Sequence, residues 1–134
     1  MKTCLIVDDS DIIREIIVRL VRDLGLDPQE ASTANAAVEM CGSNKPDVVL
    51  LDWDLPSMGA LDFLRGAGNL EKEMRPTIVL CATENDPQQF SLAKAAGAEH
   101  HLLKPFDKST LSELFEELDL IEGSGEGAKD RAVS

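Results

Sequence analysis

The sequence predicts a doubly wound α/β fold: a five-stranded parallel sheet in the order 2-1-3-4-5, with five helices packed on its two faces. Short apolar segments alternate with helical patterns along the 134 residues. The strongest segment, residues 48–51, is apolar at every position, as expected of a strand that is buried on both faces. Strands that alternate with helices form parallel sheets through right-handed crossovers.

The first strand and the first helix are predicted from an apolar run and a capping signal. Residues 3–7 (TCLIV) are typical of a strand. Ser10 or Asp11 can cap the helix that follows, and Gly25 ends it. Within this helix apolar residues recur every four positions, at Ile12, Ile16, Leu20 and Leu24.

The middle of the chain is expected to hold an edge strand, two helices and the strongest strand. The edge strand is expected near residues 29–33. A helix over 34–43 should end at a Gly-Ser-Asn sequence that precedes Pro46. The buried strand 48–51 follows, and then a helix near 58–67.

The last third contains two strands and two helices. Residues 77–81 are predicted to form the fourth strand, and a helix over 87–97 begins with proline and ends with glycine. Residues 101–103 form a short fifth strand. Asp107 caps a last helix, whose apolar residues are Leu111, Leu114, Phe115 and Leu118.

Composition indicates one folded domain over residues 1–121 and a disordered tail over 122–134, which lacks the apolar content that a core needs. No apolar run approaches the roughly 18 residues of a spanning helix, and the start shows no signal-peptide pattern. We therefore expect a cytoplasmic protein with no membrane partner.

The charge balance and the cysteines narrow the function further. The net charge of −12 argues against nucleic-acid binding, which relies on clustered Lys and Arg. It is explained either by a partner with a basic face or by solubility alone. Cys4, Cys41 and Cys81 are expected to be small buried hydrophobic residues in a reducing compartment, with no disulfide or zinc role.

Four charged residues each follow an apolar strand segment: Asp8 with Asp9, then Asp52, then Lys104. Side chains just past the carboxyl ends of parallel strands meet in one crevice. Two unit charges about 4 Å apart repel by roughly 4 kcal/mol at an effective dielectric constant of 20. Three carboxylates and one ammonium in one place therefore indicate a hard cation, Mg²⁺, together with a phosphoryl group.

An aspartate carboxylate can also attack phosphorus and form an aspartyl phosphate. Such a transfer needs in-line positioning and charge neutralisation, which Mg²⁺ and Lys104 would supply. Taken singly, these residues could be helix caps or solvated loop charges. Their joint position after successive strands favours a phosphoryl-transfer site.

The residues that carry this pattern resemble the CheY-type receiver domain of two-component signalling. They are LIVDDS at 5–10, VVLLDWDLP at 48–56 and AAGAEHHLLKPF at 95–106, with the helix after them. The resemblance covers about residues 3–121 and implies a flavodoxin-like or CheY-like fold.

The resemblance also implies roles for individual residues. A histidine kinase or phosphotransfer protein would donate a phosphoryl group to Asp52. Asp8, Asp9 and Asp52 would hold Mg²⁺, with the backbone carbonyl of Asp54 as a further ligand. Lys104 would contact the phosphoryl group, and its bond to the next proline would be cis, as in that family.

The sequence departs from this family at the switch position, where a Thr or Ser usually ends the fourth strand. Counting back from Lys104 places Ala82 there, although a shift of one residue would place Cys81 or Thr83. Alanine cannot donate the hydrogen bond, which contributes roughly 1.5–3 kcal/mol when the acceptor is charged. A weakened switch is expected, unless Thr83 replaces the missing hydroxyl.

Other positions leave alternatives open. His101 aligns with the family's switch aromatic and is either a swinging, titratable side chain or an ordinary strand residue. Gly59-Ala60 replaces the usual Asp-Gly, so the turn before the third helix is expected to differ. Trp53 is either a residue of the pocket edge or part of the core.

The leading hypothesis is a single-domain response regulator that signals by phosphorylation-dependent protein contact through the face of helix 4, strand 5 and helix 5. A phosphate sink or a phosphorylation-independent scaffold is the alternative, motivated by Ala82. Asp52-Trp53-Asp54 also resembles the nucleophile motif of haloacid-dehalogenase-type phosphatases. That motif normally lies on the first strand of a longer chain, so we do not expect an enzyme.

Overall fold

We describe residues 1–122 of the protein from a computed structural model. The tail predicted over 122–134 lies outside the described residues, apart from its first residue. Among residues 1–122 the strands are β1 (Thr3–Val7), β2 (Asp27–Ala31), β3 (Val48–Asp52), β4 (Thr77–Ala82) and β5 (His100–Leu103). The helices are α1 (Asp11–Asp23), α2 (Ala34–Asn44), α3 (Gly59–Gly68), α4 (Pro87–Ala95) and α5 (Lys108–Glu117), with short 3-10 turns η1 (Pro56–Met58) and η2 (Lys72–Met74).

The described strands form one parallel sheet in the order β2-β1-β3-β4-β5, which confirms the predicted topology. In the register of the sheet, Val7 of β1 lies beside Leu51 of β3, and Asp52 lies beside Cys81 of β4. The carboxyl ends of β1, β3 and β4 are therefore level with one another at one edge. The chain reverses its winding direction between β1 and β3, so the crevice expected of this topology opens there.

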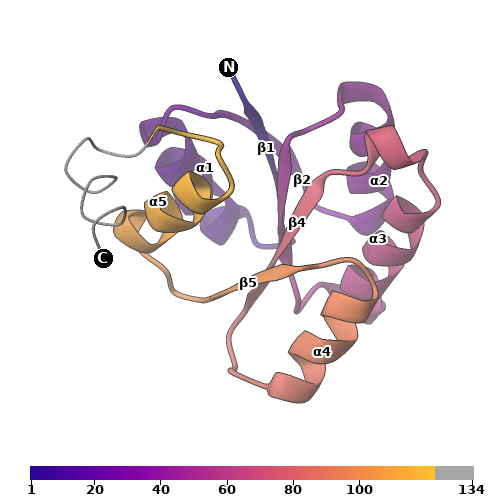
Figure 1. The fold of residues 1–134 in the computed structure, drawn as a ribbon. Helices are drawn as coiled ribbons and strands as arrows, with labels where there is room; N and C mark the ends of the chain where they lie inside the picture. The colour runs from indigo at the N-terminus through magenta and orange to yellow at the C-terminus, as the bar shows by residue number, and fades with distance from the viewer. Residues whose placement is uncertain (123–134) are drawn as a thin grey trace.

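Helices cover both faces of the sheet (Figure 1). On one face, α1 and α5 pack on alternate residues of the central strands, such as Ile6 and Leu50. On the other face, α2, α3 and α4 pack on the intervening residues, such as Leu5 and Val49. The four apolar residues of β3 are buried, as their uninterrupted run predicts, and Asp52 at the end of the strand is buried with them.

The edge strand β2 differs from its prediction. It spans Asp27–Ala31 where residues 29–33 were expected. Only Ala31 in this strand is buried, so no apolar alternation marks its ends. Its bounds follow from pairing with β1, where Thr3 lies beside Asp27 and Val7 beside Ala31. Pro28 is tolerated because β2 is an edge strand.

The row of apolar residues that recurs every four positions in α1 is only partly buried, because Leu20 and Leu24 pack against the core and the residues before them do not. Ile12 and Ile16 belong to that row and are 72% and 51% exposed. The helix buries Ile17, Val18 and Val21 against the sheet instead. Ile12 and Ile16 therefore form an exposed apolar strip on the first half of α1.

The turn between β3 and α3 contains two successive left-handed residues, Ser57 (φ 56°) and Met58 (φ 61°). Non-glycine residues adopt this conformation at a cost of roughly 1–2 kcal/mol each. Gly59 then begins α3, where a Cβ atom would lie 3.0 Å from the Cβ of Leu55. The close approach accounts for glycine at this position.

Candidate functional site

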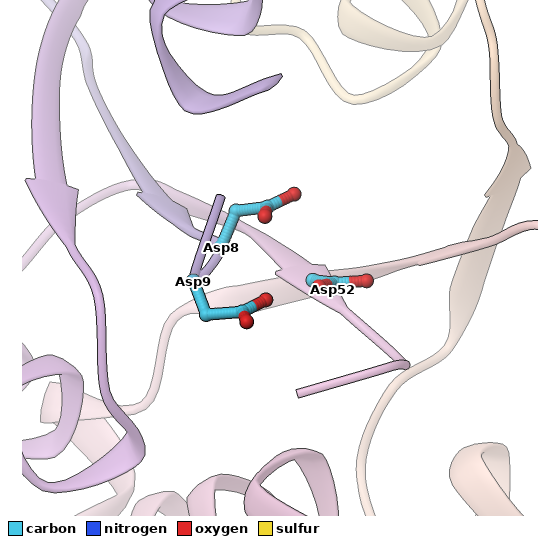
Figure 2. A group of neighbouring side chains, drawn as sticks. All are labelled: Asp8, Asp9 and Asp52. Atoms are coloured by element: carbon cyan, nitrogen blue, oxygen red, sulfur yellow. The ribbon is translucent and has the colours of Figure 1, made fainter. Parts of the chain in front are cut away.

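Three carboxylates meet at the carboxyl edge of the sheet, as the sequence predicts. Asp8 and Asp9 directly follow β1, and Asp52 ends the neighbouring strand β3. One carboxylate oxygen from each of the three lies within 4.8 Å of the others (Figure 2). Asp8 and Asp52 are only 3% and 4% exposed, whereas Asp9 is exposed.

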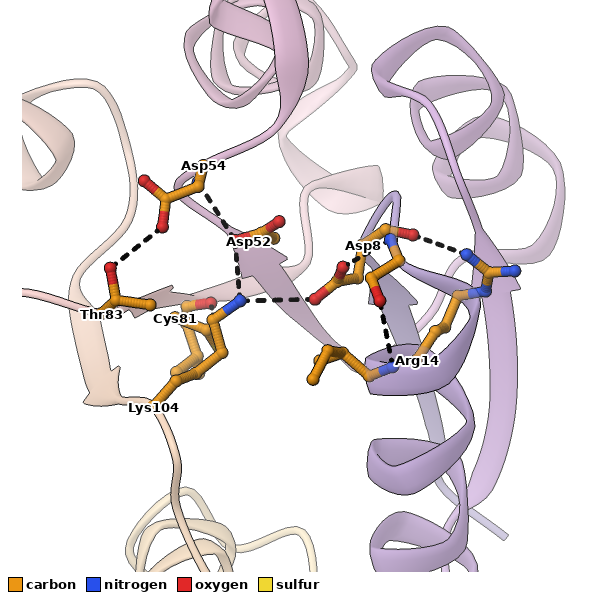
Figure 3. A network of polar contacts seen from close by, with 10 residues as sticks. Asp8, Arg14, Asp52, Asp54, Cys81, Thr83 and Lys104 are labelled. Atoms are coloured by element: carbon orange, nitrogen blue, oxygen red, sulfur yellow. Dashed lines mark hydrogen bonds and ion pairs between the residues drawn. The ribbon is translucent and has the colours of Figure 1, made fainter.

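Lys104 lies among these carboxylates, directly after β5. Its Nζ atom is 2.9 Å from Oδ1 of Asp52 and 3.4 Å from Oδ2 of Asp8 (Figure 3). Its backbone N–H donates to the carbonyl of Ala82 at 2.7 Å, which ties this residue to the end of β4. The peptide bond between Lys104 and Pro105 is cis, as the family resemblance implied.

Backbone groups orient the two buried carboxylates. The N–H of Ser10 donates to Oδ1 of Asp8 at 2.9 Å, and the N–H of Asp54 donates to Oδ1 of Asp52 at 3.1 Å. Both bonds span two residues and form Asx-type turns, which explains why each carboxylate faces inward directly after its strand.

Arg14 is a positioning residue that the sequence analysis missed. Its Nη1 atom donates to the backbone carbonyl of Asp8 at 2.6 Å, and its other nitrogens pair with Asp11 and Glu30. It thereby fixes α1 and β2 to the loop that carries Asp8. The acidic residue three positions before Arg14 was the available sequence signal.

The charges alter the pKa values of two site residues. Burial is the largest influence on Asp8 and raises its pKa, and the charge of Asp52 raises it further against the opposing effects of Ser10 and Lys104. For Lys104, burial lowers the pKa, but the hydrogen bond and charge of Asp52 with the charge of Asp8 outweigh it and leave the pKa raised. Lys104 is therefore a cation at neutral pH.

The three carboxylates fit a magnesium ion. Each offers a hard oxygen ligand, and Mg²⁺ in proteins takes one or two carboxylates with waters and phosphate oxygens. The buried Asp8 and Asp52 have Lys104 as their cationic neighbour, and the exposed Asp9 leaves one side of the cluster accessible to solvent. The donor chemistry and the open side suit an ion that keeps part of its hydration shell.

The candidate switch residues differ in burial and in the groups that they contact. Ala82 ends β4 and is 2% exposed, so a buried methyl group occupies the position at which the family usually has the hydroxyl of Thr or Ser. Thr83 follows it in the turn, and its Oγ1 atom donates to Oδ2 of Asp54 at 3.3 Å. His101 of β5 is exposed and stacks on Phe90 of α4.

The cysteines take no part in the chemistry of the cluster. Cys4, Cys41 and Cys81 are all buried and have free thiols. Burial raises the pKa of Cys41 to about 11 and that of Cys81 to about 12. These thiols are therefore protonated at neutral pH, and their role is packing.

An apolar groove borders the cluster. It is lined by residues of α1, by Thr83 and by the segment Lys104–Phe106, and encloses about 350 Å³. Its α1 wall is formed by Ile13, Ile16, Ile17 and Leu20. The groove thus joins the exposed apolar strip of α1 to the lysine that contacts Asp52.

The site lies in a chain that matches a known protein family over most of its length. The profile of the response regulator receiver domain matches residues 4–116. The chain belongs to this family. As a receiver domain it is a phospho-acceptor response regulator of the CheY type and not a classical enzyme, so the phosphatase alternative is rejected. Among residues 1–122, no helix is long and apolar enough to cross a membrane.

Single-domain chemotaxis proteins are among its relatives. The receiver is 32% identical to the chemotaxis protein CheY-3 of Vibrio cholerae, over 85% of this chain and 88% of the relative. It is 33% identical to the chemotaxis protein CheY of Pseudomonas aeruginosa, over 85% of this chain and 93% of the relative.

Solved structures show the same fold. The CheY4 response regulator of Vibrio cholerae matches with a TM-score of 0.80 and 27% identity, over 88% of this chain and 98% of that one. The receiver domain of the sensor histidine kinase PA1611 of Pseudomonas aeruginosa matches with a TM-score of 0.78 and 21% identity, over 87% and 96%. That structure has a magnesium ion coordinated in its active-site cleft.

Proposed function

We propose that Asp52 accepts a phosphoryl group from a histidine kinase or a phosphotransfer protein, in a reaction that requires Mg²⁺. The observation that carries the proposal is the contact of the Lys104 ammonium with Asp52, at 2.9 Å, beside two further carboxylates. The Lys104 ammonium, together with a metal ion held by these carboxylates, would neutralise the charge that a phosphoryl group brings to Asp52.

In the transfer, a carboxylate oxygen of Asp52 attacks the phosphorus of the donor's phosphohistidine. The new O–P bond forms as the N–P bond breaks, and the donor imidazole leaves and takes up a proton. Bound Mg²⁺ would supply charge neutralisation of the phosphoryl oxygens.

Asp8, Asp9 and Asp52 are the side chains that we assign to the metal, with the backbone carbonyl of Asp54 as a further ligand. We expect the Lys104 ammonium to contact the phosphoryl group once it is attached to Asp52, because the Nζ atom already lies within hydrogen-bond distance of that carboxylate.

Intact-mass spectrometry after incubation with acetyl phosphate and Mg²⁺ tests the proposal. We expect the mass of one phosphoryl group on the wild-type protein and none on Asp52→Asn. Asp62→Asn, an exposed acidic residue on α3, is the matched control and should be modified like the wild type. Phosphoryl mass on the Asp52→Asn variant, or none on the wild-type protein, would contradict the assignment of Asp52 as the acceptor.

We propose further that the protein donor docks over the apolar groove beside α1. A donor that reaches Asp52 has to approach close to Lys104, and the groove next to this lysine is apolar and open. An amphipathic helix of the donor, with its apolar face against the exposed Ile13 and Ile16 of the groove, is the occupant that fits this surface.

Ile16→Ser separates docking from chemistry. We expect it to slow phosphorylation by the kinase about tenfold or more while leaving the rate with acetyl phosphate unchanged, because the small donor needs no docking surface. Leu92→Ser, an equally exposed apolar position on α4, is the control. Equal slowing with both donors would show damage to the site in place of lost docking.

For the output, we propose protein contact through the face formed by α4, β5 and α5. This face carries the Phe90–His101 stack and the acidic residues of α5, such as Glu113 and Glu117. The buried methyl of Ala82 keeps a second candidate open, a phosphate sink or a constitutive scaffold. Partner affinity that is the same for Asp52→Asn and for the phosphorylated protein would favour that second candidate.

A further inference from the structure

Thr83 and Asp54 form a hydrogen bond across the mouth of the site. Asp54 follows β3 by two residues and Thr83 follows β4 by one. The hydroxyl Oγ1 of Thr83 donates to Oδ2 of Asp54 at 3.3 Å, and both residues are exposed (Figure 3). The bond links the two loops that border the carboxyl ends of neighbouring strands.

Each end of this bond is also tied to the phosphoryl-accepting centre. The backbone N–H of Asp54 donates to Oδ1 of Asp52 at 3.1 Å. Thr83 shares the lining of one groove with Lys104, whose backbone is bound to Ala82. Thr83 therefore borders the groove beside Lys104 and bonds to a residue whose backbone is bonded to Asp52, directly after Ala82, which offers only a methyl group.

We propose that Thr83 supplies the hydroxyl that binds the phosphoryl group on Asp52, and that Asp54 is the positioning residue that holds this hydroxyl while Asp52 is unmodified. The inference rests on the proposed function of Asp52 as phosphoryl acceptor.

The Thr83 hydroxyl has two possible acceptors, and whether Asp52 is phosphorylated decides which of them it binds. A threonine hydroxyl has one proton and donates one hydrogen bond, so it binds either the Asp54 carboxylate or a phosphoryl oxygen. A phosphoryl group brings additional charge and strong acceptor oxygens, which compete with a carboxylate at the solvent-exposed mouth. The Asp54 carboxylate therefore disfavours phosphorylated Asp52 in two ways: it competes for the Thr83 hydroxyl, and its charge repels the phosphoryl group.

Calorimetric titration with beryllofluoride, an analogue of the phosphoryl group, tests the inference at fixed Mg²⁺. We expect Thr83→Val to weaken beryllofluoride binding about tenfold, the loss of one hydrogen bond to a charged group. Mg²⁺ binding in the absence of beryllofluoride should stay unchanged. Thr77→Val makes the same chemical change at the start of β4, away from the site, and should bind like the wild type.

Two further variants separate a direct contact from a general disturbance of the loop. Asp54→Ala should tighten beryllofluoride binding. The gain should be about threefold larger in the wild-type background than in Thr83→Val, because substitutions of two residues in contact have non-additive effects of this size. Ala82→Ser in the Thr83→Val background should restore binding, because it returns a hydroxyl to the end of β4.

The outcomes distinguish this inference from the function on which it rests. Wild-type binding that is lost in Asp52→Asn, with Thr83→Val binding as tightly as the wild type, overturns the role of Thr83 alone. A second, combined result also overturns the role of Thr83: Thr83→Val binds weakly without rescue by Ala82→Ser, and the effects of Thr83→Val and Asp54→Ala simply add. Failure of the wild type to bind overturns the proposed function and the inference together.

Discussion

Phe90 of α4 and His101 of β5 stack with their ring centroids 4.1 Å apart and their planes inclined by 18°. The stack holds the ring of His101 against α4, and in the register of the sheet His101 lies beside Leu80 of β4. His101 thereby couples the last strand of the sheet to the helix that forms the neighbouring part of the proposed output face.

This contact predicts a measurable coupling in stability. Phe90→Ala and His101→Ala should each destabilise the protein, and the double variant by less than the sum, with a coupling free energy of about 0.5–1.5 kcal/mol. Urea unfolding of the four proteins gives the value. The same cycle with His100→Ala in place of His101→Ala should give a smaller coupling, and a value near zero for both pairs would contradict a stabilising stack.

Magnesium should stabilise the fold through Asp8. The folded state disfavours the ionised Asp8 carboxylate, because burial and the charge of Asp52 raise its pKa. Mg²⁺ at 100 times its dissociation constant should stabilise the wild type by about 2.7 kcal/mol, which raises Tm by about 8–10 °C.

Asp8→Asn removes one of the repelling charges and retains an acceptor for the N–H of Ser10. It should raise Tm in metal-free buffer by about 2 °C or more and reduce the magnesium-dependent rise to less than about 2 °C. Thermal unfolding with EDTA and with MgCl₂ measures both effects. An Asp8→Asn protein that keeps the full magnesium response would exclude Asp8 as a ligand.

Gly66 and Gly68 of α3 should respond oppositely to alanine. A Cβ atom on Gly66 would lie 2.7 Å from Cγ2 of Val38 in α2, whereas a Cβ atom on Gly68 meets nothing within 4 Å. We expect Gly68→Ala to stabilise by about 0.4–1 kcal/mol. Gly66→Ala should destabilise by about 1 kcal/mol, because overpacking outweighs the gain in helix propensity.

Chemical unfolding of both variants checks the glycine prediction. Val38→Ala removes the obstructing methyl groups, so Gly66→Ala should cost less in that background than in the wild type. Equal stabilisation by both glycine substitutions would mean that α2 and α3 separate easily.

The cap of α5 predicts a dependence of stability on pH. The backbone N–H and the hydroxyl of Thr110 both donate to Oδ1 of Asp107, and these bonds lower the pKa of the carboxyl. The folded state then binds fewer protons than the unfolded state, so this stabilisation is present above the ordinary pKa of aspartate and is lost as the pH falls through the lowered value.

Asp107→Asn keeps an oxygen acceptor at the cap but cannot ionise. The difference in Tm between wild type and Asp107→Asn should be constant above about pH 5 and should shrink as the pH falls below about 4. Thr110→Val should reduce the difference without abolishing it, since the backbone donor remains. A difference that does not depend on pH would show that the charge of Asp107 is unimportant.

The positions of Asp8, Asp52 and Lys104 could be predicted from the sequence because they depend on a general property of parallel sheets. Apolar runs fix where the strands end, and the alternation of strands and helices fixes the direction in which they run. Residues that follow such runs have to meet at one edge. The fully buried β3 is the clearest case, since every residue of its run is apolar.

The bounds of β2 and the buried face of α1 could not be predicted in the same way. β2 has only one buried residue, so hydrogen-bond pairing with β1 defines its ends. In α1, Ile12 and Ile16 continue a regular apolar row, yet Ile17 and Val21 face the sheet. A helix with apolar residues on two sides does not reveal from its sequence which side is covered.

The hydrogen bond between Thr83 and Asp54 is a third kind of case. Its partners lie 29 residues apart on separate turns, and only the geometry of both turns brings the side chains together. The sequence could nominate Thr83 as a substitute for the hydroxyl missing at Ala82. It could not identify the carboxylate that this hydroxyl meets.

Lys104 contacts carboxylates that precede it by 52 and by 96 residues along the chain. No contiguous fragment that excludes either Asp8 or Lys104 contains the complete electrostatic centre. A proteolytic product or a truncated gene that loses β5 would keep the carboxylates and lose their cation. A circular permutant opened in an exposed loop would retain both, so the centre depends on the closed arrangement of the sheet and not on the order in which its strands are connected.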